Sequence, residues 1–193
     1  NLNLAKKDVV LDKNFFKVYS KFSPGPITYI VKKKNNSKIR PIVCANLKTV
    51  GIRFPKNKIT RQILKKLKFP LAMPSANKST SISPVRPKDV SEEFENKIKV
   101  VDGGITRIGI ESTVLNLVGQ ISILRPGIIT SHQIEKILKI KIKFPKNQKV
   151  IRSPGALSRH YSPGIPLLLN KKKCPKKYAF ITFGPSYPVT RNT

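Results

Sequence analysis

Short β-branched runs alternate with amphipathic helical segments along most of this chain, and clusters of proline and glycine separate them. We expect strands at 27–31, 41–44, 49–54, 112–118 and 120–124, and a further strand that ends at 101. Helices are expected over 12–22, 59–67, 88–94 and 130–138, where apolar side chains recur at helical spacing. Such alternation is typical of an α/β or α+β domain, and we predict one that ends near residue 142.

Local signals place several element ends. Asp12 is a candidate N-cap for the first of these helices, which stops at the Ser-Pro-Gly-Pro run of residues 23–26. Thr130 and Gln133 have the spacing of a capping box. Gly119 separates two β-branched runs and indicates a hairpin.

The chain beyond residue 142 changes in composition. Residues 143–165 are rich in proline, lysine and serine and lack apolar periodicity, so we interpret them as a linker. Residues 166–193 then read as the start of a second, small α/β domain, with strands at 165–170 and 178–183. At roughly 28 residues, this unit is too short for an independent core.

The charge balance is strongly positive. Lys and Arg number 39 against 9 Asp and Glu, a formal net charge of +30. Such an excess attracts nucleic acid or polyphosphate. However, 30 of the 39 are Lys, which accompany many Ile and Asn, as an AT-biased coding sequence would produce. Nucleic-acid readers favour Arg, so background lysine enrichment and a functional basic face both stay open.

Several function classes are excluded by what the sequence lacks. No apolar run approaches the ~18 residues of a membrane helix. The two cysteines lie 130 positions apart, which excludes a disulfide scaffold and a multi-cysteine zinc site and is consistent with a reduced, cytoplasmic protein. Neither common glycine-rich phosphate loop is present. We predict no metal site built by the protein alone and assign no catalytic residue.

Chemistry-bearing residues instead gather in small-residue and hydroxyl-rich loops at strand ends. Such loops present backbone N–H groups, hydroxyls and isolated arginines to an anionic ligand. Five segments of this kind are residues 23–28, 49–53, 74–79 with 83–84, 102–114, and 123–127.

In order and spacing, these segments resemble the YrdC-like family, the threonylcarbamoyl-AMP synthases. Ser153-Pro154-Gly155 and the Arg-His-Tyr-Ser-Pro run of residues 159–163 are similar to the interdomain linker of the long form, which has an extra C-terminal domain. The resemblance covers nearly all of residues 15–166. It implies a twisted open sheet with flanking helices around a deep, positively lined cavity, in an α/β fold.

The resemblance also implies a nucleotidyltransferase reaction. L-threonine, bicarbonate and ATP, with Mg²⁺ accompanying ATP, would give threonylcarbamoyl-AMP and pyrophosphate. A separate transferase complex would then use the product to modify an adenosine beside the anticodon of tRNA. The implied partners are therefore these substrates and that complex, and also tRNA or double-stranded RNA if the basic surface binds nucleic acid.

The site residues implied by the resemblance fall into two groups. Arg53, Met73 and Ser112 would contact L-threonine, with Arg53 on the carboxylate and Met73 acting through its backbone. Contacts to ATP would come from Thr49, Ser75, Asn77, Ser83, Arg125 and the linker residue Tyr161. Because carbamate and ATP are both anionic, cationic and N–H donors are the chemistry that the reaction needs.

Each of these residues also has an ordinary structural explanation. The alternative for Arg53 is a surface arginine on an exposed strand edge, and for Arg125 it is a structural salt bridge to one of the few acids. Thr49 would be a plain β-former, and Met73 and Tyr161 would be packed side chains. Ser75, Asn77 and Ser83 would be ordinary turn or loop residues, and Ser112 would be a hydroxyl at the entry of a strand.

The sequence departs from the family at both ends. The family's N-terminal segment, with a threonine-contacting hydroxyl and a Lys-x-Arg motif for the ATP phosphates, is missing, and residues 1–4 resemble the strand that follows it. Ser23 stands where an aromatic residue is usual, and the C-terminal domain stops at Thr193. We expect a fragment of an active synthase. An RNA- or nucleotide-binding YrdC-like module and an inactive remnant are the alternatives.

Overall fold

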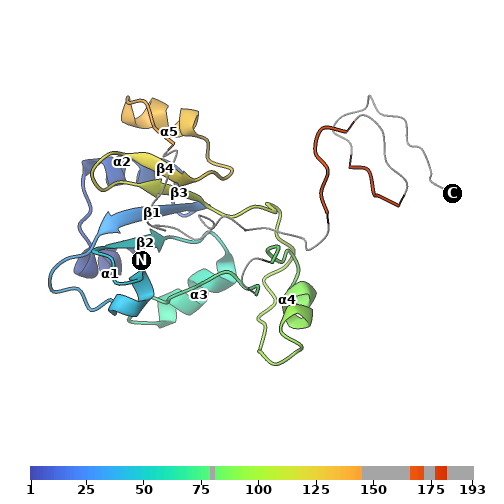
Figure 1. The fold of residues 1–193 in the computed structure, drawn as a ribbon. Helices are drawn as coiled ribbons and strands as arrows, with labels where there is room; N and C mark the ends of the chain where they lie inside the picture. The colour runs from blue at the N-terminus through green and yellow to red at the C-terminus, as the bar shows by residue number, and fades with distance from the viewer. Residues whose placement is uncertain (79–80, 145–165, 172–176, 182–193) are drawn as a thin grey trace. The chain divides into compact units, whose positions relative to one another are not determined.

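The computed structural model describes residues 1–78, 81–144, 166–171 and 177–181 (Figure 1). The chain divides into two units, residues 1–163 and 164–193. The described helices and strands all belong to the first unit. In chain order they are α1 (Leu2–Asp8), α2 (Lys13–Phe22), β1 (Ile27–Lys32), the 3₁₀ helix η1 (Pro41–Cys44), β2 (Thr49–Arg53), α3 (Lys58–Lys66), α4 (Pro87–Glu93), β3 (Thr113–Asn116), β4 (Ser122–Arg125) and α5 (Ser131–Leu138).

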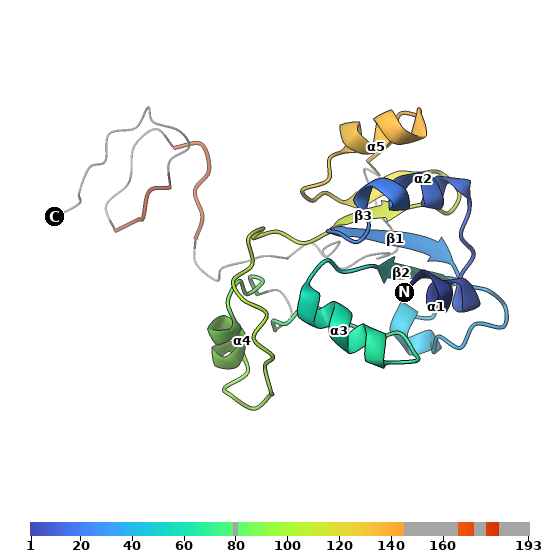
Figure 2. The ribbon, with the colours of Figure 1, turned by 180° about the vertical axis from the view of Figure 1, so that it is seen from behind.

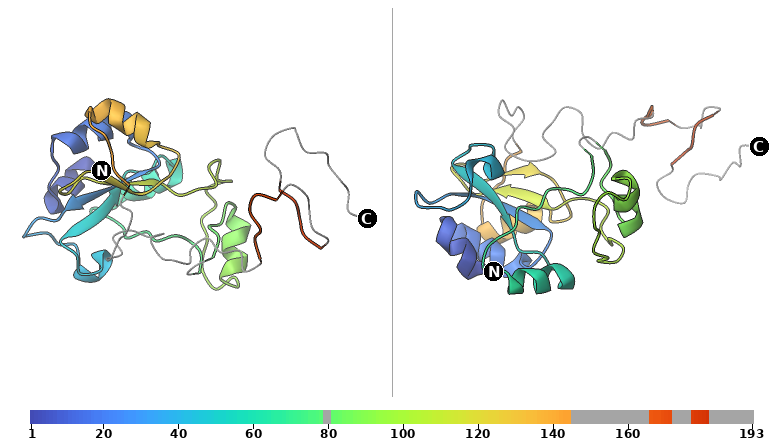
Figure 3. Two further views of the ribbon diagram at one scale, coloured as in Figure 1. Left: turned by 45° about the horizontal axis from the view of Figure 1, so that its top comes forward. Right: turned by 90° about the horizontal axis from the view of Figure 1, so that it is seen from below.

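The strands form one mixed sheet in the order β2-β1-β3-β4 (Figures 1 and 3). β1 pairs antiparallel with β2 and parallel with β3, and β3 pairs antiparallel with β4. Helices and strands thus share a single domain, and the predicted α/β class is confirmed.

The hydrophobic core lies between one face of the sheet and the helices α2 and α5, which lie together above it in Figure 1 and in the reverse view of Figure 2. Phe15 of α2 is completely buried, and its ring lies 4.9 Å from the ring of Tyr29 in β1. Other members of this core are Val18, Ile27, Val31, Leu115, Ile123, Ile134 and Leu138.

The predicted helix starts are confirmed by their hydrogen bonds. The Asp12 carboxylate accepts a bond of 2.8 Å from the Phe15 N–H. Thr130 and Gln133 form the reciprocal capping box, since each side chain accepts a bond from the other residue's backbone N–H, at 2.9 and 3.3 Å. Gly119 in the β3–β4 turn has a φ of +69°, which only glycine adopts readily.

Two segments expected to be strands are helical instead. Residues 41–44 form η1, because Pro41 has no N–H to give to a sheet and suits the first turn of a helix. Residues 2–4 form the first turn of α1, and Asn1 is its N-cap residue. The Asn1 side chain caps this helix by accepting a 2.9 Å bond from the Leu4 N–H, and Leu2 packs against the core.

Other strand predictions are also wrong where the structure describes the residues. Residues 100–101 have no strand partner, and the described residues 166–171 and 177–181 contain no strand. A strand needs a neighbour for its N–H and C=O groups, and none of these short runs has one among the described residues. The boundaries at 142 and 165 stay predictions, because most of the expected linker lies outside the described residues.

Among the described residues, no helix is long and apolar enough to cross a membrane.

Candidate functional site

The sheet topology gathers four polar side chains at one end of the sheet. β1 and β3 are parallel, and both begin at this end, where Thr28 and Ser112 lie. The neighbouring strands β2 and β4 run the other way and finish there with Arg53 and Arg125. Two predicted threonine ligands, Arg53 and Ser112, and one predicted ATP ligand, Arg125, are therefore brought together by strand direction.

Ser112 lies at the centre of this group and is only 4% exposed. Its hydroxyl is 2.8 Å from that of Thr28, although the two residues are 84 positions apart in the chain. Arg125 holds Ser112 from the other side. Its Nε and Nη2 donate to the Ser112 carbonyl at 3.1 and 3.0 Å, and its Nη2 also donates to the Ser112 hydroxyl at 3.1 Å. The described partner of Arg125 is therefore Ser112, just before β3, and not the acidic residue that a structural salt bridge would need.

Arg53 lies directly across the β1–β2 pair from Thr28. Its Nε is 3.4 Å from the carbonyl oxygen of Gly25, to which it donates. The residue as a whole is exposed, but partial burial of its guanidinium and the positive charge of Arg125 lower the pKa of Arg53 below its ordinary value. Two like charges held near each other favour an anionic ligand.

A pocket of about 320 Å³ opens to solvent and reaches Glu111 at the entry of β3, although its described lining contains none of the four residues of this group. Ser75 and Ser83, both predicted ATP contacts, line it, as does Glu111, the residue before Ser112. The Ser83 hydroxyl forms a short hydrogen bond with the Glu111 carboxylate. The remaining described lining comes from Ala76, from small and apolar residues of the segments 84–90 and 100–110, and from Arg86.

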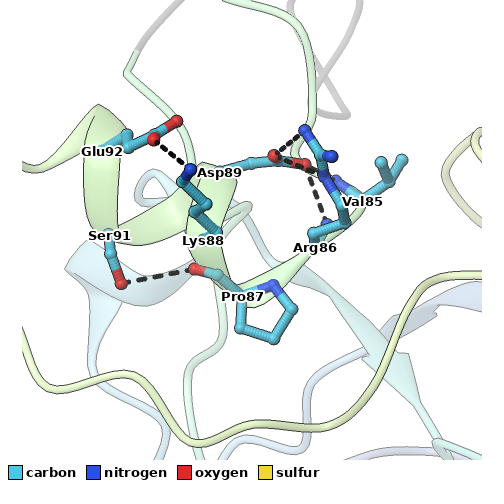
Figure 4. A network of polar contacts seen from close by, with 7 residues as sticks. All are labelled: Val85, Arg86, Pro87, Lys88, Asp89, Ser91 and Glu92. Carbon is cyan, nitrogen blue, oxygen red and sulfur yellow. Dashed lines mark hydrogen bonds and ion pairs between the residues drawn. The ribbon is translucent and has the colours of Figure 1, made fainter.

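Among the described residues, Arg86 is the one cation that lines this pocket, and it is bonded within the start of α4 (Figure 4). Its Nη2 is 2.8 Å from a carboxylate oxygen of Asp89, and the hydrogen bond from Arg86 lowers the pKa of Asp89. Asp89 also accepts bonds from the backbone N–H groups of Val85 and Arg86. Arg86 therefore serves the start of α4, while Arg53 and Arg125 supply the cationic groups beside the sheet.

Three other predicted ligands lie apart from this group. Thr49 is at the opposite end of β2 from Arg53, about 13 Å along the strand at the usual rise per residue. Met73 is 65% exposed and does not line the pocket. Asn77 folds its own loop by donating from Nδ2 to the carbonyls of Lys78 and Ser81, at 3.0 and 2.9 Å. Tyr161 lies outside the described residues.

Sequence reasoning assigned no role to Thr28 or Glu111, although both lie in segments that it singled out. Their signal was a polar residue at the start of a predicted strand, within it at Thr28 and just before it at Glu111. Only the pairing of β1 with β3 shows that the Thr28 hydroxyl meets Ser112.

The arrangement suits an anion more than a metal ion. Among the described residues, no group of three or more His, Cys, Asp or Glu side chains lies close enough to hold a metal. Two guanidinium groups, two hydroxyls and a neighbouring pocket can instead bind a carboxylate or a phosphate through charge-assisted hydrogen bonds.

Comparison with known proteins gives matches over most of the chain. Residues 1–127 match the Sua5/YciO/YrdC family, described as telomere recombination, and residues 129–186 match the family described as threonylcarbamoyl-AMP synthase, C-terminal domain. A threonylcarbamoyl-AMP synthase of Bacillus subtilis is 39% identical over 155 residues, which cover 77% of this chain and 44% of that protein. One of Pyrococcus abyssi is 36% identical over 156 residues, which cover 77% of this chain and 45% of that protein.

A solved structure agrees with these matches. The crystal structure of Pyrococcus abyssi Sua5 complexed with L-threonine superposes with a TM-score of 0.73 at 32% identity. The superposition covers 82% of this chain and 48% of that one. The matched part of the chain thus spans less than half the length of the two curated relatives described above.

Proposed function

Because the chain belongs to the Sua5/YciO/YrdC family, we propose that it acts as an L-threonylcarbamoyladenylate synthase, a nucleotidyltransferase of tRNA modification. Its substrates would be L-threonine, bicarbonate and ATP. The observation that carries the proposal is the group formed by Arg53, Arg125 and the hydroxyl pair of Thr28 and Ser112, which lies at one end of the sheet beside an open pocket.

The reaction has two bond-forming steps. The threonine amine attacks the carbon of bicarbonate, and loss of water leaves a carbamate anion. A carbamate oxygen then attacks the α-phosphorus of ATP, and pyrophosphate departs with the bridging oxygen and its electron pair. Both reactants are anionic, so the largest contribution of the protein is to offset their repulsion with preorganised positive charge and N–H donors.

On this proposal Arg53 binds the threonine carboxylate, and the hydroxyls of Thr28 and Ser112 lie beside that carboxylate. Its guanidinium fork can hold both carboxylate oxygens, and its link to Gly25 supports its orientation. Arg125 braces Ser112 and adds positive charge next to the reacting groups. The backbone of Met73 remains a proposed contact for threonine.

ATP would occupy the pocket lined by Ser75 and Ser83. Thr49, Asn77 and Tyr161 remain proposed nucleotide contacts. Thr49 and Arg53 lie at opposite ends of β2, so only an elongated set of ligands would touch both. A nucleotide bound next to an amino acid has that length. Mg²⁺ would arrive with ATP and neutralise its phosphates. Of the residues that the structure describes, Glu111 is the one acid that lines this pocket, so we assign the ion chiefly to phosphate oxygens and to no residue of the chain.

Downstream partners are part of the same proposal. The product is a labile mixed anhydride that a transferase complex would consume in the cytoplasm, where tRNA is modified.

Direct contact with tRNA or double-stranded RNA is supported by α3, whose exposed Lys58, Arg61 and Lys65 are spaced so that they lie on one face of the helix. The helix has no acidic residue to oppose them. These three residues form the α3 basic face.

RNA binding at the α3 basic face is tested by reversing its charge. The double variant Arg61→Glu/Lys65→Glu should weaken RNA binding and flatten the dependence of log Kd on log salt, because fewer counterions are released. Lys88→Glu/Lys97→Glu makes the same charge change around α4 and is the matched control. Equal weakening by both variants would mean that net charge alone, and no particular surface, attracts RNA.

The synthase activity is tested by pyrophosphate release from ATP. We expect release by the purified chain only when both threonine and bicarbonate are present. If the chain is silent, an N-terminal segment with a Lys-x-Arg motif should be joined to it. Rescue would support a fragment of an active enzyme. Continued silence would refute the synthase, and RNA binding by the silent chain would then favour a binding module over an inactive remnant.

A further inference from the structure

A second pocket, of about 310 Å³, lies where the end of α2, the loop of residues 23–26 and the start of α5 meet. Its described lining consists of residues 21–26, 56, 128–129 and 133, and it is named the α2–α5 pocket here. Its volume is at the lower end of the range for small-molecule sites. It shares no described lining residue with the pocket proposed for ATP, and none of the four polar residues at the end of the sheet lines it. The α2–α5 pocket is therefore separate from the places proposed for threonine and ATP.

Two lysines give this pocket a positive charge. Lys21 lies in the last turn of α2, and Lys56 follows β2. Neither forms an ion pair with an acid in the part of the chain that the structure describes, and the described lining contains no acid. Because α2 ends and α5 begins beside the pocket, their helix dipoles oppose each other there and the lysines decide the sign. Two ammonium groups match a phosphate monoester, which carries a charge of about −1.5 to −2 at pH 7.

Most of the other lining is apolar. Phe22, Pro24 and Pro26 come from the end of α2 and the loop after it, and Ile128 and Ile129 precede α5. Ile129 is 6% exposed and closes the wall, whereas Ile128 is 47% exposed and leaves apolar surface that a ligand can cover. The pocket therefore suits an anion that carries an apolar body.

The walls of the pocket are held in place by the protein's own hydrogen bonds. Gly25 is buried, and its N–H donates to the Phe54 carbonyl at 2.8 Å. A Cβ at Gly25 would lie 2.2 Å from the carbonyl oxygen of Phe22, so this tight loop requires glycine. Gln133 is fixed by its capping box with Thr130. A pocket formed in advance needs little further ordering when a ligand binds.

We propose that the α2–α5 pocket binds a phosphate monoester of a small apolar or aromatic alcohol. Lys21 and Lys56 bind the phosphate, and the apolar body lies against Ile128. This site goes beyond the proposed function, because it is occupied by neither threonine nor ATP.

The test is calorimetric titration of the full chain with phenyl phosphate at about 0.15 M salt, which screens the general attraction of the net charge. Lys21→Gln/Lys56→Gln should weaken binding about tenfold or more, because two charge-assisted contacts are lost. Lys17→Gln/Lys58→Gln removes two exposed lysines outside the pocket and is the matched control, which should bind within about twofold of the original chain. Thermal unfolding of each variant verifies that it is folded. Lys21→Arg/Lys56→Arg keeps both charges and should bind within about threefold.

A second comparison tests the apolar half of the ligand. Ile128→Ala should weaken phenyl phosphate binding about fourfold, the effect of one buried CH₂ group, and should leave the binding of inorganic phosphate unchanged. Ile42→Ala, which shortens an exposed side chain of η1 outside the pocket, is the control and should bind both probes like the original chain.

Three outcomes would overturn the inference. The first is that the original chain does not bind phenyl phosphate. The second is that inorganic phosphate binds as tightly as phenyl phosphate, which would mean attraction to charge only. The third is an equal loss in the two Lys→Gln double variants, which would place the ligand elsewhere. None of these measurements uses threonine, so their failure would leave the proposed function to its own test by pyrophosphate release.

Discussion

Arg53 is the residue at which geometry and charge agree most closely. It ends β2, opposes Thr28 and has its pKa lowered by burial and by Arg125. A cation held in this state gains from an anionic partner, because such a partner offsets both the lost hydration and the like charge. The planar guanidinium is suited to a carboxylate in a way that an ammonium is not.

Replacing Arg53 by Lys should therefore keep the charge and lose the two-pronged grip. We expect threonine binding to weaken by about tenfold or more, since one charge-assisted bond of about 1.5–3 kcal/mol is lost. Calorimetric titration measures this loss. Arg61→Lys, the same change on the exposed surface of α3, should leave threonine binding unaltered. Equal binding by Arg53→Lys and the original chain would argue against a bidentate contact.

Tyr29 offers a prediction about pH. Burial raises the pKa of Tyr29 to about 12, against the opposing effect of its hydrogen bond with Ser23. The folded chain thus prefers the neutral phenol. The stability that this provides is complete below pH 10 and is lost as the pH rises from about 10 towards 12.

In Tyr29→Phe the free energy of unfolding should decline less steeply between pH 10 and 12. The variant also loses one hydrogen bond, so below pH 10 we expect it to be less stable by about 1 kcal/mol. Chemical denaturation at a series of pH values measures both effects. An unchanged slope in Tyr29→Phe would show that the buried phenol does not control this pH range.

At the scale of elements, α5 depends on its N-terminus. The helix has only eight residues, of which Ile134 and Leu138 are buried against the core. Short helices are marginal by themselves, so the cap and this packing must act together.

Thr130→Ala should remove the hydroxyl half of the capping box and cost about 1 kcal/mol of stability. Thr130→Ser keeps the hydroxyl and should cost less than half as much. The free energy of unfolding from denaturant titration distinguishes them. Equal losses in the two variants would mean that the methyl group of Thr130, and not its hydroxyl, stabilises the helix start.

The whole domain is held by one core that joins α2, α5 and the sheet. Phe15 is completely buried and meets the rings of Tyr19, Tyr29 and Phe54, whereas its neighbour Phe16 is 38% exposed. The chain as a whole carries a charge of +30, and six of its nine acids lie between residues 89 and 111. Self-repulsion therefore opposes the compact state over most of the molecule, and the apolar core must offset it.

Phe15→Ala should cost about 3–5 kcal/mol of unfolding free energy, the usual result of deleting a buried ring. Phe16→Ala is the matched control, one position away, and should cost less than half of that because much of its ring is already in water. Denaturant unfolding compares them. Similar losses in both would mean that the aromatic cluster is not the centre of the core.

The sequence by itself determined the local structure of this protein. Asp12 and Thr130 capped the helices predicted for them, and Gly119 formed the predicted turn. These features depend on residues within four positions of one another, so their physics can be read from the chain. The site residues of the motifs came from a family resemblance, and their roles stay predictions.

Only the tertiary structure decided which of those residues meet. The parallel pairing of β1 with β3 brings Thr28 to Ser112 across 84 positions. The antiparallel pairing of β2 with β1 places Arg53, and not Thr49, at the same end of the sheet. Residues 41–44, with the composition of a strand, became a 3₁₀ turn because the sheet offered them no partner and Pro41 had no N–H to give. Strand order and direction arise from burying a whole face of the sheet at once, and no local pattern contains that information.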